Sequence, residues 1–380
     1  MRKTIKLFGF LASFAFAGGL SPVLADTATP APTPAAPSVV VNGMVDTYYS
    51  FNFSNSSNGQ NGTGNVGYFY NNVDNGYTLG LAEAKLTATQ GPASAHLVLA
   101  YGQEGSLGLL GTGLDVLQAY VSYTSGQWTF NGGRFVTWMG DEVVESNSNW
   151  NYSHSLLFNY IPVWHTGLSV NFAPSSTFNV SGFITDGNNS TSSSNDGKEY
   201  GLQAIITPSS QWTITLNGEF GPEAGNATAF NNLGNLTAEG IFIFKPDAMW
   251  SFGLDAQYGM TSLPSGSTPS STSYMGAALY GRDQVASDWA VAVRLEDVMD
   301  SGELGYGLYN GTSWVQGSVM EGTLTVEHNF STNMLVRLEG RYDTNSMPTG
   351  VGTATAAASI YANGLSTSQV TGTVGAVLSF

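Results

Sequence analysis

The most constraining feature of this sequence is a period-two alternation of apolar and polar residues that recurs along most of its length. In the segment 212–220, Trp, Ile, Leu, Gly and Phe occupy the even positions, whereas Thr, Asn and Glu occupy the odd positions. Similar alternation is found in the segments 41–53, 250–258, 323–330 and 334–343. Successive side chains of a β-strand point to opposite faces, so the pattern predicts strands with one apolar and one polar face. These strands are about 10 residues long, the length that a tilted strand needs to cross a bilayer.

The connections between the predicted strands alternate between tight and long. Tight turns are predicted at 90–92, 124–126, 174–176, 208–210, 246–247, 283–287 and 331–332. Long polar segments are found near 54–76, 103–114, 137–163, 187–196, 221–234, 260–273, 297–316 and 344–368. This pattern predicts a transmembrane antiparallel β-barrel of about 16 strands, with short periplasmic turns and long extracellular loops.

The composition excludes several other classes of protein. Only 10% of the 380 residues are charged, against about 25% in a typical soluble protein. No apolar run after position 25 reaches the ~18 residues of a spanning helix, and the absence of cysteine excludes disulfides. The net charge of −16 argues against nucleic-acid binding, which needs clustered Lys and Arg. An acidic chain suits either cation passage or solvated acidic loops, and both remain open.

The amino-terminal region has the layout of an export signal. Arg2, Lys3 and Lys6 precede an apolar stretch at 7–20, and small residues lead up to Ala25. We therefore expect a signal peptide at 1–25, cleaved near Ala25. A linker rich in Thr, Ala and Pro is expected at 26–38, followed by an outer-membrane β-barrel at 39–380.

Aromatic residues gather at the predicted strand ends. Those that follow tight turns are Trp128, Phe130, Trp212, Trp250 and Trp289, and those that approach long loops are Tyr49, Phe51, Phe53, Phe220 and Tyr258. This arrangement predicts two girdles of rings at the headgroup levels of an outer membrane, where lipid is the partner. The last alternating strand ends in Phe380 and resembles the assembly signal of bacterial outer-membrane proteins, so the barrel-assembly machinery is a predicted partner.

Three segments carry a family resemblance: GGRFVTWMGDEVVE at 132–145, NYSHSLLF at 151–158 and HTGL at 165–168. They resemble the OmpL-like β-barrel porin-2 proteins, which typically show a Gly-(Lys/Arg)-Phe strand end, a Gly-x-Glu element and a Tyr-Ser-(His/Arg)-Ser segment. Arg134 fills the basic position and Glu142 the acidic one, while Trp138 or Met139 replaces the usual Pro. The resemblance implies a porin fold and passive transport, without naming a substrate.

In general porins of this strand count, the third long loop folds into the barrel, which here implies an inward-folding loop near 137–163. We expect this loop to place Asp141, Glu142 and Glu145 at the narrowest point of the pore. Alternation also places other charged side chains in the lumen, beside or opposite these carboxylates. They are Lys85, Arg294, Arg337, Glu339 and Arg341. Arg134 shares its parity with outward-facing residues, so it reaches the lumen only if Gly132-Gly133 forms a bulge.

Acid facing base across a pore would create a transverse field that favours polar solutes. The alternative is that these charged groups pair with one another and pin the loop to the wall, since buried charges require partners. The aromatic residues of the same region could stack on sugar rings or pack the loop against the barrel, and we favour packing. They are Trp150, Tyr152, Tyr160 and Trp164.

The expected function is passive diffusion of small hydrophilic solutes or ions across a bacterial outer membrane. No enzyme is expected, because Gly-x-Ser-x-Gly, His-Glu-x-x-His and Walker motifs are absent, and no cofactor or metal is implied. A homotrimer remains open. The alternatives are a surface adhesin or structural barrel with a blocked lumen, an apolar-solute transporter with a plug, and a soluble secreted β-protein.

Overall fold

The structure is a computed structural model. It describes residues 36–54, 65–104, 114–192, 197–222, 234–262, 271–301, 308–309, 314–315, 317–346 and 368–380. Residues 37–380 belong to one compact unit. The predicted signal peptide lies outside the described residues, and so does the predicted linker up to residue 35.

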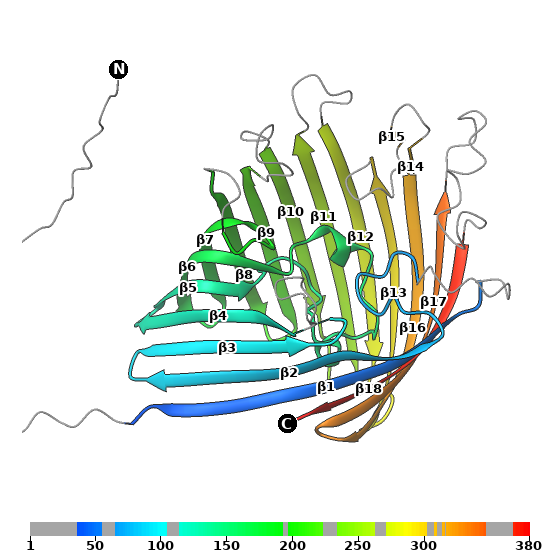
Figure 1. Ribbon diagram of the computed structural model, residues 1–380, viewed down its shortest axis with the longest axis horizontal. Coiled ribbons are helices and arrows are strands. Elements are labelled where there is room, and N and C mark those ends of the chain that lie inside the picture. Colours follow the sequence, from blue (N-terminus) through cyan, green and yellow to red (C-terminus); the bar gives the residue numbers. More distant parts are fainter. Residues whose placement is uncertain are drawn as a thin grey trace, which may run out of the picture. The chain divides into compact units, whose positions relative to one another are not determined.

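Sixteen antiparallel strands close into a barrel, in which neighbours in the chain lie side by side (Figure 1). The strands are β1 (Ser38–Asn52), β2 (Gly76–Gln90), β3 (Ala93–Tyr101), β4 (Leu114–Ser125), β5 (Trp128–Val136), β6 (Trp164–Ser175), β7 (Phe178–Asn188), β8 (Glu199–Ser209), β9 (Trp212–Pro222), β10 (Gly234–Phe244), β11 (Trp250–Ser262), β12 (Ser271–Asp283), β13 (Trp289–Asp300), β16 (Gly317–Ser331), β17 (Met334–Ser346) and β18 (Ser368–Ser379). The predicted strand number and antiparallel arrangement are confirmed.

The barrel closes between the first and last strands. Register pairs run from Met44 with Ser379 to Asn52 with Thr371. At the end of this seam, the backbones of Gly43 and Phe380 exchange two hydrogen bonds of 2.9 Å. Closure leaves no strand edge of the wall exposed, which is what a sheet needs in a lipid environment.

Connection lengths follow the predicted alternation. Tight connections join β2 to β3, β4 to β5, β6 to β7, β8 to β9, β10 to β11, β12 to β13 and β16 to β17, and all other links are long. Strands β14 (Leu308–Tyr309) and β15 (Trp314–Val315) pair in one of the long links. We call the two rims of the wall the tight-turn end and the long-loop end.

The two faces of the wall differ as the alternation predicts. In β9, Trp212 and Leu216 are 40% and 46% exposed on the outside, whereas Asn217 and Glu219 are 6% and 3% exposed inside. Phe252 is likewise exposed outside, so these apolar faces are not buried between stacked sheets. Among the described residues, no helix has the length and hydropathy needed to cross a membrane.

Candidate functional site

The third long connection lies inside the barrel. This lumenal loop, residues 137–163 between β5 and β6, contains the short 3-10 helices η1 (Ser146–Ser148) and η2 (Leu157–Tyr160). Its Gly140 amide donates to Glu239 of β10 at 2.8 Å, and its Tyr152 hydroxyl donates to Asp46 of β1 at 2.6 Å. β1 and β10 are separated by six strands in one direction around the wall and by eight in the other. The loop therefore crosses the lumen from one side to the other.

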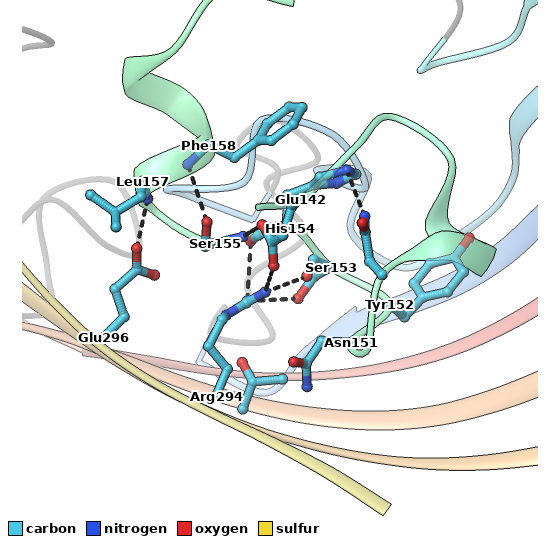
Figure 2. Close-up of polar contacts among 12 residues, drawn as sticks. Glu142, Asn151, Tyr152, Ser153, His154, Ser155, Leu157, Phe158, Arg294 and Glu296 are labelled. Atoms are coloured by element: carbon cyan, nitrogen blue, oxygen red, sulfur yellow. Dashed lines mark hydrogen bonds and ion pairs between the residues drawn. The ribbon is translucent and has the colours of Figure 1, made fainter. Parts of the chain in front are cut away.

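Arg294 of β13 is a fully enclosed contact between wall and loop. Its Nη1 donates to Glu142 Oε1 and to the Ser153 carbonyl, both at 2.7 Å, and its Nε donates to Glu321 Oε1 at 2.6 Å. Figure 2 shows the guanidinium among Glu142, Ser153 and His154. The side chain has no exposed surface. A planar guanidinium with five donors can hold two carboxylates and a carbonyl together, which a point-charge ammonium cannot do.

Two further arginines of β17 hold the loop backbone in the same way. Arg337 pairs with Glu327 at 2.7 Å and donates to the Asn149 carbonyl at 2.7 Å. Arg341 pairs with Asp343 at 2.7 Å and donates to the His154 carbonyl at 2.8 Å. Arg337 and Arg341 are each 2% exposed. Each guanidinium thus joins a wall carboxylate to a carbonyl of the loop backbone.

Carboxylates of the wall accept hydrogen bonds from backbone N–H groups of the loop. Glu339 accepts from the amides of Tyr152 at 2.6 Å and Ser153 at 3.0 Å. Glu296 accepts from the amides of Leu156 and Leu157, both at 2.6 Å. Paired backbone N–H groups on one carboxylate are charge-assisted hydrogen bonds, which are stronger than neutral ones. The loop is therefore bound mainly through its main chain.

The charged residues are in direct contact, as in the alternative in which they pair with one another and pin the loop to the wall. Glu142 meets Arg294, and Glu145 meets Lys85, which also lies 3.1 Å from Glu83. Within the described residues Asp141 forms no ion pair. The physical reason is that a charge removed from water needs a partner at contact distance, and the loop passes close enough to the wall to supply one.

The route by which Arg134 reaches the interior also differs from the prediction. The strand pairing across Gly132-Gly133 is continuous with both neighbours, so no bulge is present there. Instead Gly133 adopts φ +135°, a backbone conformation that side chains rarely tolerate. Arg134 is 7% exposed, lies 3.6 Å from Asp115 and stacks 3.4 Å above the Trp164 ring.

The aromatic residues of the loop pack against the wall. Tyr152 and Trp164 are 0% and 1% exposed, and Tyr160 stacks on Tyr274 with ring centroids 4.2 Å apart. Trp150 meets Tyr280 edge to face at 6.3 Å. These contacts agree with the expectation that the aromatic side chains pack the loop against the barrel and do not form a surface for sugar rings.

Wall glycines that the sequence pattern did not predict receive two of the loop's aromatic rings. A Cβ on Gly375 would lie 2.1 Å from the Tyr152 ring, and a Cβ on Gly201 would lie 2.1 Å from the Trp138 ring. Only glycine lets the rings approach the strands this closely. The available signal was a glycine at a lumen-facing position of a strand, where a side chain would otherwise project.

Asp141 makes the loop sensitive to pH. Burial, together with the carboxylates of Glu142 and Glu239, raises the pKa of Asp141 from its usual 3.8 to about 7, against the opposing charge of Lys245. Asp255 of β11 faces the same group. A carboxyl with a raised pKa stabilises the fold in its protonated form. That stabilisation is complete below the unfolded-state pKa near 3.8 and is lost as the pH rises towards 7.

We therefore expect the free energy of unfolding of Asp141→Asn to fall less than that of the wild type between about pH 4 and pH 7. Guanidinium unfolding of the refolded barrel in detergent at several pH values measures this difference. Asp247→Asn, at an exposed position in the β10–β11 connection, is the control and should follow the wild type. Parallel curves for Asp141→Asn and the wild type would contradict the expectation.

Two polar cavities lie between the lumenal loop and the tight-turn end of the barrel. One, of about 280 Å³, is lined by residues that include Asn149, Glu327 and Arg337. The other, of about 340 Å³, is lined by residues that include Lys85 and Glu145. Asn147 and Ser148 of the loop border both. Charged groups of the site can therefore meet water from this end of the lumen.

The non-enzyme expectation stays a prediction. Ser94 Oγ lies 2.9 Å from His96 Nε2, but the other ring nitrogen of His96 faces Thr87 at 3.3 Å and not a carboxylate. That pair lacks the orienting acid of a hydrolase triad. His328, on the outer face, stacks on Trp289.

Comparisons with known proteins agree with this fold. No curated protein sequence matches the chain. An anion-selective porin from Comamonas acidovorans superposes with a TM-score of 0.61 at 14% identity, covering 91% of this chain and 100% of that chain. In-vitro folded OmpT, an outer membrane protein of Vibrio cholerae in its trimer form, gives 0.60 at 13%, covering 91% and 100%. The outer membrane channel DcaP of Acinetobacter baumannii gives 0.56 at 11%, covering 90% and 97%.

A closed 16-strand barrel with an apolar outer face and a loop inside its lumen defines the class of bacterial outer-membrane porin-like barrels. A sequence profile of the family described as "Putative beta-barrel porin-2, OmpL-like" matches residues 38–380, and the chain belongs to this family. The resemblance carried by the segments 132–145, 151–158 and 165–168 is thereby confirmed.

Proposed function

We propose that this protein is a porin through which small hydrophilic solutes or ions cross the outer membrane by passive diffusion. One observation carries the proposal: the loop covers the lumen unevenly. Inward-facing polar side chains of β4–β7 keep part of their surface exposed, among them Ser122, Asn131, Ser169 and Asn171. Those of β13, β16 and β17 that hold the loop are buried. Partly exposed hydroxyls and amides inside a closed wall are the lining that a polar pore needs.

A second candidate is a barrel with a closed lumen that serves as an adhesin or structural protein. It is favoured by the apolar packing inside the wall. Tyr48, Leu81, Met139 and Phe158 form part of one buried cluster, and a second cluster surrounds Leu157. Close-packed side chains at the level of the loop would exclude solutes, because protein interiors leave few voids larger than a water molecule.

Conductance in planar lipid bilayers separates the two candidates. The refolded chain is expected to insert with stepwise increases in current, since each closed barrel would add one polar path. Heat-unfolded protein from the same preparation is the negative control and should give no current steps. Absence of current steps under all voltages and salts, from protein that is shown to be folded, would reject the porin and support the closed barrel.

Ion selectivity tests whether the cavity of about 340 Å³ lined by Lys85 lies on the path of permeating ions. Lys85→Glu reverses a charge that lines this cavity. The reversal potential in a salt gradient should therefore shift in the direction of greater cation selectivity. Lys198→Glu is the matched control, because Lys198 pairs with Asp186 and lines neither cavity. Equal reversal potentials for the two variants and the wild type would remove Lys85 from the path.

The remaining parts of the proposal concern export and assembly. We propose cleavage of a signal peptide near Ala25 and recognition of Phe380 by the barrel-assembly machinery. Phe380 is 66% exposed beside the closing seam, which supports a role in recognition. A homotrimer is proposed from the fold shared with OmpT, described in a trimer form. Chemical cross-linking of the chain in native membranes would show a threefold mass.

A further inference from the structure

Three ligand-type side chains from three strands converge near the long-loop end, away from the arginine contacts. They are His165 of β6, Glu199 of β8 and Glu219 of β9, and one donor atom of each lies within 4.8 Å of the others. Their exposed fractions are 0%, 1% and 3%. We propose that this trio binds a divalent transition-metal ion, and that Zn²⁺ is the ion whose ligand preferences it fits best.

The spacing of two of the donor atoms fits metal coordination. His165 Nδ1 and Glu199 Oε2 are 3.3 Å apart. Two ligands that each lie about 2.0 Å from a tetrahedral zinc are separated by about 3.3 Å. One imidazole and two carboxylates leave a fourth position for water, a combination that zinc accepts.

Unsatisfied atoms point to a missing ligand. His165 Nδ1 and Glu199 Oε1 are both buried and have no hydrogen-bond partner. Buried polar atoms are almost always hydrogen-bonded, so two atoms without a hydrogen bond in one cluster require an explanation. A cation between the side chains would satisfy both of them.

The surrounding hydrogen bonds have the pattern found around metal ligands. His165 Nε2 lies 3.2 Å from Thr137 Oγ1, and Thr185 Oγ1 donates to Glu199 Oε2 at 2.9 Å. Asn188 Nδ2 donates to Glu219 Oε1 at 3.4 Å. When Nε2 carries the proton and donates to Thr137, Nδ1 keeps its lone pair for a metal. Such outer hydrogen bonds orient ligands and fix the tautomer.

Charge also favours a cation. In the part of the chain that the structure describes, no lysine or arginine forms an ion pair with Glu199. The nearest lysine in sequence, Lys198, pairs instead with Asp186. Two buried carboxylates close to one imidazole favour a cation between them, because buried charges require a partner. A bound ion would also stabilise the start of the lumenal loop, because the Trp138 ring stacks on His165 at 4.2 Å.

Metal content of the refolded barrel tests the proposal. The chain, produced without a histidine tag and refolded in chelator-treated detergent, is loaded with Zn²⁺, dialysed and measured by mass spectrometry of the metal. Wild type should retain about one ion per chain, and His165→Ala should retain none, since a three-ligand site loses one of its ligands. His96→Ala removes another inward-facing histidine outside the cluster and should retain the ion. Thr137→Val should bind about 10- to 100-fold more weakly in calorimetry.

Folding of each variant is checked by its heat-dependent migration in electrophoresis. If His165→Ala does not fold, the isosteric Glu199→Gln takes its place, with the same expected loss of zinc. Folded wild type that retains no zinc, or equal retention by wild type and the ligand variants, would overturn the proposal. The measurement needs no conductance, so its outcome is independent of the proposed pore.

Discussion

Replacing Arg294 with methionine is expected to lower the free energy of unfolding of the barrel by about 3–5 kcal/mol. The substitution keeps most of the side-chain volume but removes a charge that holds Glu142 and Glu321 at 2.7 and 2.6 Å. Both carboxylates would remain buried without their common partner. The Ser153 and His154 carbonyls, to which Arg294 also donates, would lose a donor.

Guanidinium unfolding of the refolded barrel in detergent measures the loss. Arg282→Met is the matched control, because Arg282 pairs with Glu327 but is partly open to solvent, and it should cost about 1 kcal/mol or less. If Arg294→Met does not fold, Arg294→Lys retains the charge without the fork of donors and should show an intermediate loss. Equal unfolding midpoints for Arg294→Met and Arg282→Met would show that the guanidinium does not hold the loop.

Filling the wall notch at Gly375 is expected to displace the lumenal loop. In Gly375→Val the new side chain would begin 2.1 Å from the Tyr152 ring. Overpacking of this kind costs about 1–3 kcal/mol of stability. Because Tyr152 also donates to Asp46, moving the ring would break a hydrogen bond by which the loop holds β1, beside the one that comes from Ser146, and should raise the single-channel conductance.

Gly340→Val provides the control, since a Cβ at Gly340 meets no atom within 4 Å. It should leave conductance and unfolding unchanged. Adding Tyr152→Ala to Gly375→Val removes the ring from the clash, so the double variant should be more stable than the sum of the two single effects predicts. Additive losses would show that the valine and the ring do not meet.

Much of the fold could be predicted because strand faces and connection lengths are local properties of a sequence. Alternation alone assigned Arg294, Arg337 and Arg341 to the lumen, since a side chain's parity depends only on its neighbours along the strand. Tight turns at Pro, Ser and Gly marked the strand ends, and their regular spacing gave the number of strands. Closure then followed from that even number.

The partners of these residues could not be predicted in the same way. Glu142 and Arg294 are 152 positions apart in the chain, and only the path of the loop across the lumen brings them together. Parity also failed at Arg134, where the φ of Gly133 turns the side chain inward without a change of register. The trio around His165 comes from three strands, and no single segment of the sequence shows it.

The way the loop is held has an evolutionary consequence. Arg337, Arg341, Glu296 and Glu339 bind its carbonyl and amide groups, which every residue type except proline can offer equally. Mutations in most loop side chains would leave these attachments intact. The chemistry that the loop presents to the lumen could thus drift between descendants of one ancestral gene while the scaffold stays the same.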